Sequence, residues 1–471
     1  MMKTKKFAVL LFSVLLTSTS LTSKAQTDTA SKVHSFTAEQ AVNFALQNAV
    51  QVKNALIDIK LQEEQNKEIT ASAFPQITGS GSVNYNPNVA VQTFPNFIAA
   101  STYAVLVQEN VKKGNGDPIV SPNDFGIIEA QFGSKYNANA GIDINQILFD
   151  GQVFVGLLAR KAAIKNAELT ADVTKEQIKA NVYKIYYQLS VGKRQIGTLD
   201  ANIANYEKLL HDTRIIYENG FAEKLDVDKV QVQLNNLQTQ KLKTQNQLDA
   251  GVAGLKFLMN MPQKDVLILS DTLSDEDVKQ NILDEDYSYT DRKQYQLLES
   301  TIKLNEYNVK RYQLSKLPTV SLAGNYSKSA QRQQFDVFKG PYFTSSFIAI
   351  RLNVPIFDGG AKNARVATAR LNVMKIQNNL DQLKASIDND ISQSRINMKS
   401  AIYTLDNQKK NIELAEQVYN TTKLKYEQGL GSNQEISNAQ ADLVAAQNNY
   451  YGSLYDAINA KIDFLNAAGK L

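Results

Sequence analysis

The sequence predicts a mixed α and β fold in which one structural plan occurs twice: a helix, two strands, a long helix, a turn and a returning helix. Two observations carry this prediction. The tripeptide Phe-Asp-Gly ends a strand-like alternation at Asp150 and again at Asp358, which follows 208 residues later. A long helical pattern follows each time and closes at a Tyr-x-x-Gly turn, at Gly220 and at Gly429. Such an internal duplication sets the architecture before any single element is assigned.

The first residues are predicted to be a secretory signal peptide, residues 1–25, with early lysines, an apolar run over 7–16 and a small-residue end before Gln26. A membrane anchor is the alternative, but the run is far shorter than the roughly 20 residues that a spanning helix needs. No cysteine lies near the cleavage site, which excludes lipid attachment there. Without the four lysines of this segment the chain holds 47 basic and 47 acidic residues, so no nucleic-acid partner is indicated.

The first half of the chain is assigned from a capping signal and from hydrophobic periodicity. Thr37 and Gln40 have the spacing of a capping box, which begins a helix. Alternation with a period of two predicts strands, and apolar residues at heptad spacing predict a helix about 100 Å long that packs along its neighbours. The expected elements are a helix over 37–74, a strand over 77–85, a long loop over 86–134 with some order at 103–111, a strand over 136–149, a helix over 152–218 and a returning helix over 227–260.

The second half follows the same plan after an acid-rich segment without a clear period, residues 263–290. We interpret this segment as a connector, and its acids lack the spacing and central glycine of a calcium loop, which is the alternative. Residues 26–36 are polar and expected to be loose. The expected domains are a first repeat over 26–262, the connector, and a second repeat over 291–471. The second repeat is expected to contain a helix over 290–316, strands over 319–327 and 348–356, a helix over 360–428 and a helix over 432–467.

Each predicted strand has about ten residues, which is the length that crosses a bilayer when the strand is tilted. Past the signal peptide no apolar run is long enough for a spanning helix, so a membrane-spanning form requires a closed barrel. Four strands cannot close a barrel, and the chain must borrow strands from copies of itself. Two copies would give eight strands and an interior filled by side chains, whereas three copies give twelve. The long helices would gain enough neighbours in the same way to close a coiled-coil ring.

These features together resemble the TolC-like outer-membrane efflux proteins, over nearly all of the mature chain. The resemblance rests on the duplicated plan, the two Phe-Asp-Gly junctions and the turns at Tyr217 and Tyr426, each followed by an acid six residues after its glycine. It implies a homotrimer with a twelve-stranded transmembrane β-barrel in the outer-membrane lipid, four strands per chain, continued by a tapering helical tunnel through the periplasm. It also implies a passive exit duct of a tripartite efflux pump or type I secretion system, with a periplasmic adaptor and an inner-membrane transporter as partners.

The junction residues have a direct physical interpretation. Asp150 and Asp358 can accept hydrogen bonds from the first free N–H groups of a helix. Gly151 and Gly359 allow the chain to bend sharply from strand to helix. We therefore interpret both junctions as structural caps rather than as transport sites.

The two turns are expected to form the periplasmic tips. Gly220 and Gly429 suit the left-handed position at a helix end, and the resemblance implies that the tips, with Tyr217, touch the adaptor. In a trimer, Asp226 and Glu435 would form rings of carboxylates, and such rings select cations. The alternative is that both acids only complement the helix dipole in the first turn of their helices.

One departure from the family concerns the latch, which is the set of side-chain contacts that holds the periplasmic tip closed. The resemblance implies that Tyr426 takes part in a latch with an arginine two residues after the second glycine, but that position is Gly431. Asn438 likewise stands where the family has a second aspartate. The resemblance therefore predicts where the narrow periplasmic opening of the tunnel lies in this chain, but it does not predict the contacts that hold this opening closed.

An enzyme, a metal site and a cofactor are not predicted. The chain has no cysteine, and its two histidines, His34 and His211, lie in unrelated settings. The alternative from another class is a periplasmic coiled-coil adaptor or structural protein. That reading explains the long helices but leaves four alternating strands without a purpose, while a plain porin explains the strands but not the helices.

Overall fold

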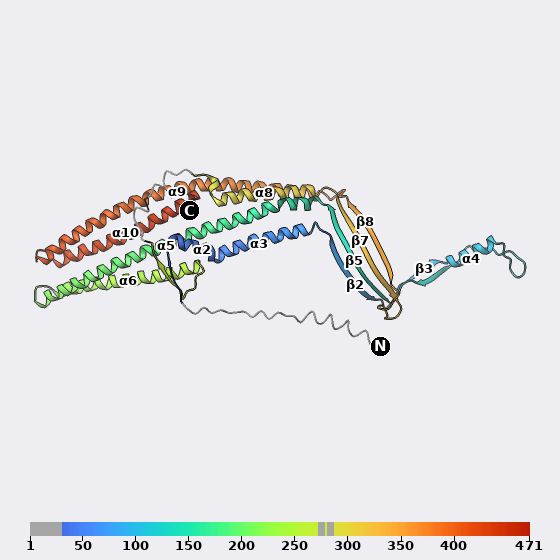
Figure 1. The fold of residues 1–471 in the computed structure, drawn as a ribbon, viewed down its shortest axis with the longest axis horizontal. Helices are drawn as coiled ribbons and strands as arrows, with labels where there is room; N and C mark the ends of the chain where they lie inside the picture. Colours follow the sequence, from blue (N-terminus) through green and yellow to red (C-terminus); the bar gives the residue numbers. More distant parts are fainter. Residues whose placement is uncertain (1–30, 272–277, 280–286) are drawn as a thin grey trace. The chain divides into compact units, whose positions relative to one another are not determined.

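The computed structural model describes residues 31–271, 278–279 and 287–471 (Figure 1). The predicted signal peptide and most acids of the predicted connector lie outside this part of the chain. The chain divides into two compact units, each made of three separate stretches. The first unit comprises Met1–Ala49, Asn181–Gln280 and Tyr403–Ile458, and the second comprises Val50–Ala180, Asn281–Ile402 and Asn459–Leu471. Each unit therefore takes residues from both halves of the predicted duplication.

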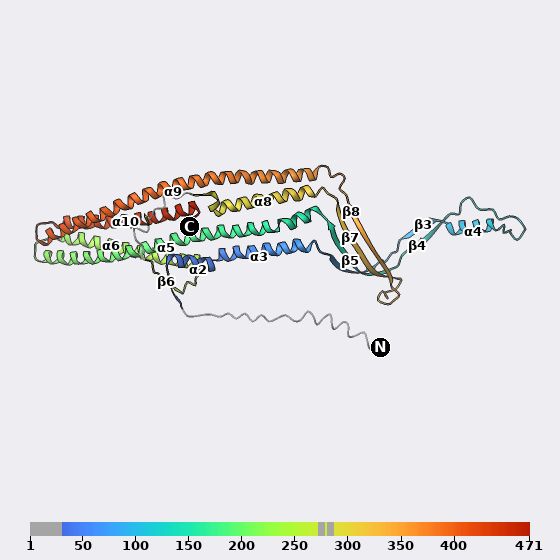
Figure 2. The same cartoon turned by 45° about the horizontal axis from the view of Figure 1, so that its top comes forward.

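A four-stranded antiparallel sheet lies in the second unit, with the strand order β2-β5-β7-β8 (Figures 1 and 2). Its strands are β2 (Gln76–Tyr85), β5 (Tyr136–Phe149), β7 (Thr319–Arg332) and β8 (Phe343–Asn353). The two halves of the chain meet where β5 pairs with β7. All four predicted strands are confirmed, but β8 does not reach Ile356 as expected. Pro355 has no N–H to donate to a ladder, so it is unsuited to a strand interior.

The sheet has one apolar and one polar face, because residues directly opposite each other across a ladder share a face. An apolar row crosses the sheet at Ile77, Ile144, Gly324 and Ile348, and the adjacent row on the other face is Thr78, Asp143, Asn325 and Phe347. On the polar face the Asn325 amide donates to the Asp143 carboxylate at 2.8 Å. The apolar face lies open in the single chain, with Ile348 84% exposed. The outer edges of β2 and β8 pair with no other strand of the described chain.

Helices continue from this sheet within the second unit. They are α3 (Val50–Ala71), α8 (Lys293–Leu314) after the short η1 (Tyr289–Asp291), and the adjoining parts of α5 (Gly151–Glu218), α9 (Ala361–Glu427) and α10 (Asn433–Ala468). The Arg292 guanidinium donates to the carbonyls of Asn466 and Ala467 at the end of α10, at 3.1 and 2.8 Å. None of the helices in the described residues combines the length and the apolar character that crossing a membrane would take.

The prediction of a long loop over 86–134 is wrong. In this segment β3 (Val91–Pro95) pairs antiparallel with β4 (Ile127–Gln131), and α4 (Phe97–Gln108) follows β3. Figures 1 and 2 show this arm extending from the end of the four-stranded sheet. The Asn96 side chain caps α4 by accepting a hydrogen bond from the N–H of Ala99 at 2.9 Å. The sequence signal for this helix is an N-cap residue in front of a run without charged residues. The ordered stretch expected at 103–111 overlaps the second half of the helix.

The first unit corrects two further expectations. Residues 26–36 are not loose throughout, because β1 (Val33–Phe36) pairs in parallel with β6 (Val266–Leu269) of the predicted connector. His34 supports this pairing through a contact of 3.3 Å between its Nε2 and Asp265 Oδ2. Tertiary pairing of two four-residue strands leaves little periodicity in the sequence, so neither strand was predictable from its own segment.

The first helix begins as predicted but is broken. α2 (Ala38–Asn48) opens with the capping box of Thr37 and Gln40, with bonds of 3.2 and 3.0 Å. It stops at Ala49, whose ψ of 134° is extended, and α3 starts afresh at Val50. The Asn260 side chain donates to the free carbonyl of Asn48 at 3.2 Å, which satisfies part of the broken helix end.

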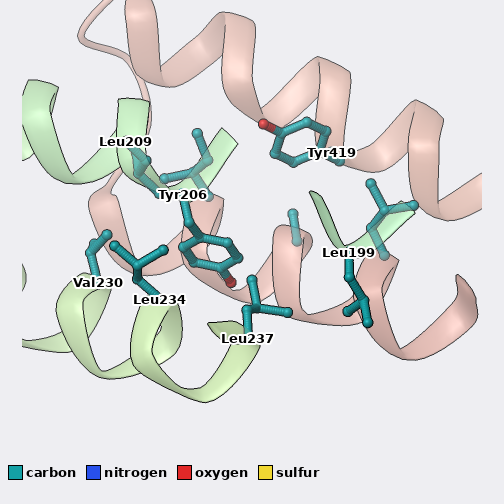
Figure 3. Close-up of a cluster of buried hydrophobic side chains, with 10 residues drawn as sticks. Leu199, Tyr206, Leu209, Val230, Leu234, Leu237 and Tyr419 are labelled. Carbon is teal, nitrogen blue, oxygen red and sulfur yellow. The ribbon is translucent and has the colours of Figure 1, made fainter. Parts of the chain in front are cut away.

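The predicted heptad seams form the core of the first unit. Residues from α5, α6 (Lys224–Leu258), α9 and α10 meet in one buried cluster (Figure 3), whose members are Leu199, Tyr206, Leu209, Val230, Leu234, Leu237, Tyr419, Ile436, Ala439 and Leu443. Burial, with a smaller contribution from the nearby Tyr419, raises the pKa of the Tyr206 hydroxyl to about 12. Leu189 and Leu248 pack against Gly251 and Gly192, where an added Cβ would lie 2.7 Å from the leucine methyl groups. Small residues thus form the holes that receive leucine knobs.

Candidate functional site

The two helix–turn–helix hairpins of the first unit, α5–α6 and α9–α10, use the same backbone turn. Gly220 has a φ of +79° and Gly429 a φ of +72°, both left-handed. In each turn the glycine N–H donates three residues back and the next N–H donates five residues back. These bonds are Gly220 to Tyr217 at 2.9 Å, Phe221 to Ile216 at 3.0 Å, Gly429 to Tyr426 at 3.0 Å and Leu430 to Lys425 at 2.9 Å. The pattern is a Schellman motif, which satisfies the last carbonyls of a helix.

The two tyrosines of the turns are not equivalent. Tyr217 is exposed, whereas Tyr426 is half-buried and packs against the buried cluster of the four helices. The Tyr426 hydroxyl lies 3.5 Å from the Thr213 hydroxyl on α5. Tyr426 therefore joins the α9–α10 turn to α5, and its contact reaches a threonine rather than the arginine that the family latch would require.

The candidate acids both lie in the first turn of their helices. The Asp226 carboxylate accepts from the N–H of Glu223 at 3.3 Å, and the Glu435 carboxylate accepts from the N–H of Ser432 at 3.4 Å. In return, the N–H of Glu435 donates to the Ser432 hydroxyl at 3.2 Å. Both acids thus occupy position N3, the last residue of a capping box, and complement the positive end of the helix dipole. This geometry accounts for an acid at each position without a role in transport.

The two hairpins touch each other directly beside these acids. The Asn433 amide donates to the Asp226 carbonyl at 3.3 Å, and the Lys229 ammonium donates to the Gln434 amide oxygen at 2.9 Å. Next to these bonds, α6 and α10 border a groove of about 420 Å³. Its lining includes Leu225, Asp228, Lys229, Gln434, Ser437 and Asn438. Neither the bonds nor the groove could be read from the sequence, because the contacting residues lie about 205 positions apart.

The first strand–helix junction is a capped helix start with a packing constraint. The Asp150 carboxylate accepts from the N–H of Gln152 at 2.8 Å. Gly151 does not have a positive φ, contrary to the expected need for backbone freedom at this bend. A Cβ at Gly151 would instead lie 2.7 Å from the Leu314 Cβ and 2.9 Å from its carbonyl oxygen, at the end of α8. Close approach of α8 requires glycine here.

The second junction uses its glycines differently. Gly359 and Gly360 both have left-handed φ values, +64° and +86°, and no atom lies within 4 Å of a Cβ built on either. The Asp358 carboxylate accepts from the N–H groups of Lys362 at 2.9 Å and Gly360 at 3.0 Å. Both hydrogen bonds lower the pKa of the Asp358 carboxyl, and the bond from the Lys362 N–H has the larger effect. At this junction the two glycines allow the left-handed backbone conformation, as the sequence analysis expected.

The turn glycines give a prediction with an internal control of opposite sign. Gly429→Ala should cost about 1–2 kcal/mol, because an L-residue is strained in the left-handed conformation and no steric clash contributes. Gly254→Ala, in the interior of α6 where a Cβ also meets nothing within 4 Å, should gain up to about 1 kcal/mol through helix propensity. Chemical unfolding of both variants measures the difference, and equal shifts would contradict the conformational explanation.

The described residues contain no group of three or more histidine, cysteine, aspartate or glutamate side chains that could hold a metal ion. His34 contacts Asp265 in the first unit, and His211 is exposed on α5. What the geometry offers is a pair of capped helical tips and a sheet with one apolar face. Duplicated long hairpins joined to an antiparallel sheet of this kind are typical of outer-membrane channel proteins.

Comparison with known sequences agrees with this class. The family model described as outer membrane efflux protein matches residues 41–261 and 296–470, and the chain therefore belongs to that family, whose members are outer-membrane channels and not enzymes. The chain is 19% identical to the outer membrane protein TolC of Vibrio cholerae over 347 residues, covering 71% of this chain and 77% of that protein. It is 21% identical to the proteases secretion protein PrtF of Dickeya chrysanthemi over 211 residues, covering 44% of this chain and 45% of that protein. The match thus spans less than half the length of PrtF.

Solved structures show the same fold. The channel CusC superposes with a TM-score of 0.71 at 14% identity, over 93% of each chain. The outer membrane protein VceC of Vibrio cholerae superposes with a TM-score of 0.68 at 14% identity, over 92% of this chain and 96% of that one. The resemblance to TolC-like proteins predicted from the sequence is confirmed, and the protein is an outer-membrane channel for efflux or secretion with a periplasmic tunnel.

Proposed function

We propose that three copies of this chain form a channel with a twelve-stranded barrel in the outer membrane and a helical tunnel in the periplasm. The observation that carries the proposal is the four-stranded sheet, with one exposed apolar face, one polar face and two edges that pair with no other strand of the described residues. Unpaired strand edges are not stable in lipid, so β2 of one copy must pair with β8 of the next. The apolar face then contacts lipid, and the polar face lines the pore.

Aromatic side chains at both ends of the sheet support the proposal that its apolar face contacts lipid. Tyr85 stacks on Tyr136 at one end, with ring centroids 4.8 Å apart. Phe149 packs against Phe154 at the other end, at 5.7 Å. Transmembrane barrels carry such aromatic residues where the apolar band meets the two interfaces. The strands between these aromatic pairs are the proposed spanning segments.

The channel acts as a passive exit duct, and an inner-membrane transporter with a periplasmic adaptor supplies cargo and energy. Relatives named for protease secretion and for efflux both match the chain, and either system fits the same duct. The exposed tips at Gly220 and Gly429 are the proposed contacts with the adaptor. In this proposal residues 26–262 and 291–471 are the two repeats, residues 263–290 connect them, and the duct needs no cofactor.

The proposed assembly can be tested by cross-linking, because the chain has no cysteine of its own. Ser80→Cys on β2 is combined in turn with a cysteine at Ser345, Phe347, Ala349 or Arg351, which lie on the same face of β8. At least one combination should bring the Cβ atoms within the roughly 3.5–4.5 Å that a disulfide requires. Oxidation in outer-membrane fractions should then give species of two and three chains, and the single-cysteine variants should remain uncross-linked. A ladder beyond three chains, or no product from any combination, would exclude the proposed barrel.

The tip acids are proposed to favour cations as well as to cap their helices. The double variant Asp226→Asn, Glu435→Gln removes six carboxylates per trimer but keeps a side-chain oxygen for each capping box. Its cation-to-anion permeability ratio should fall several-fold in planar-bilayer recordings, because the local negative potential is lost. Asp228→Asn is the control, since Asp228 is exposed nearby but belongs to neither capping box. An unchanged ratio in the double variant would leave the two acids with their capping role alone.

A further inference from the structure

Strand β8, at one edge of the sheet (Figure 1), differs from the rest of the polar face. Apart from Asp143, the residues that β2, β5 and β7 place on this face are uncharged, none is aromatic, and most are serine, asparagine, threonine or glutamine. On the same face β8 presents Phe343, Phe347 and Arg351, each four residues from the next. The polar face thus carries one strip of aromatic and cationic side chains.

The two phenylalanine rings of this strip are open to solvent. Phe343 is 60% exposed and Phe347 is 46% exposed. The residues opposite them on β7 are Ser329 and Asn325, whose side chains are too small to cover a phenyl ring. An apolar ligand that lies against these rings removes apolar surface from water, which is favourable.

Arg351 adds a charge that the chain leaves unpaired. Its guanidinium forms no hydrogen bond and no ion pair within the described residues. Asp143, the acid on this face, lies two strands from β8 and four residues further along the sheet, so the two backbones are roughly 16 Å apart. The Asp143 carboxylate already accepts a hydrogen bond from Asn325 at 2.8 Å. Arg351 is therefore available to an anionic ligand.

The proposed assembly leaves this strip uncovered. In that assembly β8 pairs with β2 of the next copy, and the polar face of β2 consists of Gln76, Thr78, Ser80, Ser82 and Asn84. None of these side chains is acidic, so none neutralises Arg351. None is aromatic or aliphatic, so none offers the phenylalanine rings an apolar partner.

We propose that β8 is a binding track for amphiphilic organic anions on the wall of the channel. The anionic group accepts hydrogen bonds from the Arg351 guanidinium, whose paired N–H donors suit such a group. The apolar part lies over Ala349 against Phe347, whose backbone is about 13 Å from that of Arg351. Arg351 lies toward the helix end of the sheet, so cargo that leaves the periplasmic tunnel meets the cation first and the phenylalanines next. The inference rests on the proposed function in one respect: the polar face must line the pore.

Because the chain has no cysteine, a thiol placed on the track can report its charge. Ala349→Cys lies between Phe347 and Arg351, and Asn139→Cys is a control thiol on the same face, two strands away. Both are modified in the assembled protein with an anionic and a cationic methanethiosulfonate reagent. We expect the ratio of anionic to cationic rates to be several-fold higher at Ala349→Cys, because Arg351 attracts the anionic reagent. Equal ratios at the two positions would contradict the role of the charge.

Two second-site variants identify the source of that preference. Arg351→Gln in the Ala349→Cys background should abolish the preference for the anionic reagent. Lys328→Gln makes an equal charge change on the opposite face of the sheet and should leave the preference in place. A preference that survives Arg351→Gln would refute the assignment.

Protection of the same thiol from a neutral methanethiosulfonate reagent measures binding. The probe is naphthalene sulfonate, which carries both a ring and a charge, and the comparison probes are methanesulfonate, without the ring, and naphthol, without the charge. Naphthalene sulfonate should slow the modification of Ala349→Cys and leave Asn139→Cys unchanged. Equal protection by methanesulfonate would show a simple anion site, and equal protection by naphthol would show an apolar site. Either result would overturn the assignment to amphiphilic anions.

Variants separate the two halves of the track in this protection assay. Arg351→Gln should weaken the binding of naphthalene sulfonate about tenfold, the usual effect of losing a charged hydrogen bond. Phe347→Ser should weaken it several-fold, because the apolar contact is lost. Phe338→Ser removes a ring that is 73% exposed in the loop between β7 and β8, outside the strip, and should leave binding unchanged. Equal effects of the two serine variants would refute the track.

The same samples distinguish failure of the track from failure of the channel. Trimer mass and single-channel conductance report on the proposed function, and protection of the thiol at Ala349→Cys reports on the track. A conducting trimer in which this thiol reacts without charge preference or protection would refute only the track. A monomer without conductance in which naphthalene sulfonate still protects the thiol through Arg351 would support the binding site and contradict the channel assembly.

Discussion

Replacing Tyr206 by alanine should cost about 3–5 kcal/mol of unfolding free energy, the range for removing a large aromatic side chain from a packed core. Tyr206 is 1% exposed and lies within the cluster that α5, α6, α9 and α10 form together. Its ring contributes to the packing of both hairpins, so the cavity left behind cannot be closed by movement of one helix alone. Urea unfolding of the detergent-solubilised protein, at one fixed protein concentration, measures the loss.

Tyr403→Ala is the matched control for this prediction. It removes the same side chain from a long helix, but Tyr403 on α9 is 71% exposed in the single chain. In the isolated chain its removal should change stability by no more than about 0.5 kcal/mol. A loss as large as that of Tyr206→Ala would mean that the buried cluster does not hold the hairpins together. A large loss confined to the assembled protein would instead place Tyr403 between copies.

Replacing Ile348 by lysine should cost about 2–4 kcal/mol per chain, the value for a lysine on the lipid face near the middle of a transmembrane barrel. Ile348 lies in the central apolar row of the sheet, opposite Gly324, and the chain itself does not cover it. The same lysine is introduced in each copy, so the amount of folded protein in outer-membrane fractions should fall steeply. Refolding into lipid vesicles followed by denaturant titration measures the cost per chain.

The next residue along the strand provides the control. Ala349 points to the opposite face, because successive side chains of a strand alternate. Ala349→Lys therefore places its charge on the proposed pore face and should cost less than about 1 kcal/mol. If Ile348→Lys and Ala349→Lys were equally tolerated, the apolar face would not contact lipid. If Ala349→Lys were the costly variant, the orientation of the sheet would be the reverse of that proposed.

The sequence was sufficient to predict an element wherever that element is long and packs against elements with the same spacing of apolar residues. The helices from Gly151 to Glu218 and from Ala361 to Glu427 match the predicted ranges within a residue or two. The four strands of the sheet were predicted because one face is apolar and the other polar, which leaves a period of two in the sequence. The left-handed turn glycines, Gly220 and Gly429, follow from the helix-end pattern alone.

The sequence was insufficient where structure arises from pairing between distant segments or from local packing. β1 and β6 pair across more than 230 residues, and neither strand is long enough to show a period. The arm with α4 was assigned to a loop because its prolines and glycines outweighed the cap at Asn96. Gly151 was explained by backbone freedom, whereas the actual constraint is that the Cβ and the carbonyl group of Leu314 leave no room for a side chain at this position.

The sequence by itself determined the duplicated plan, the strand faces, the helix lengths and the family, because each of these leaves a repeated or periodic trace in the order of residues. Only the tertiary structure decided that Asp226 and Glu435 cap their helices and that Tyr426 reaches Thr213. These relations depend on which side chains meet after the chain has folded. Distances of a few ångströms between residues far apart in sequence have no counterpart in composition or spacing.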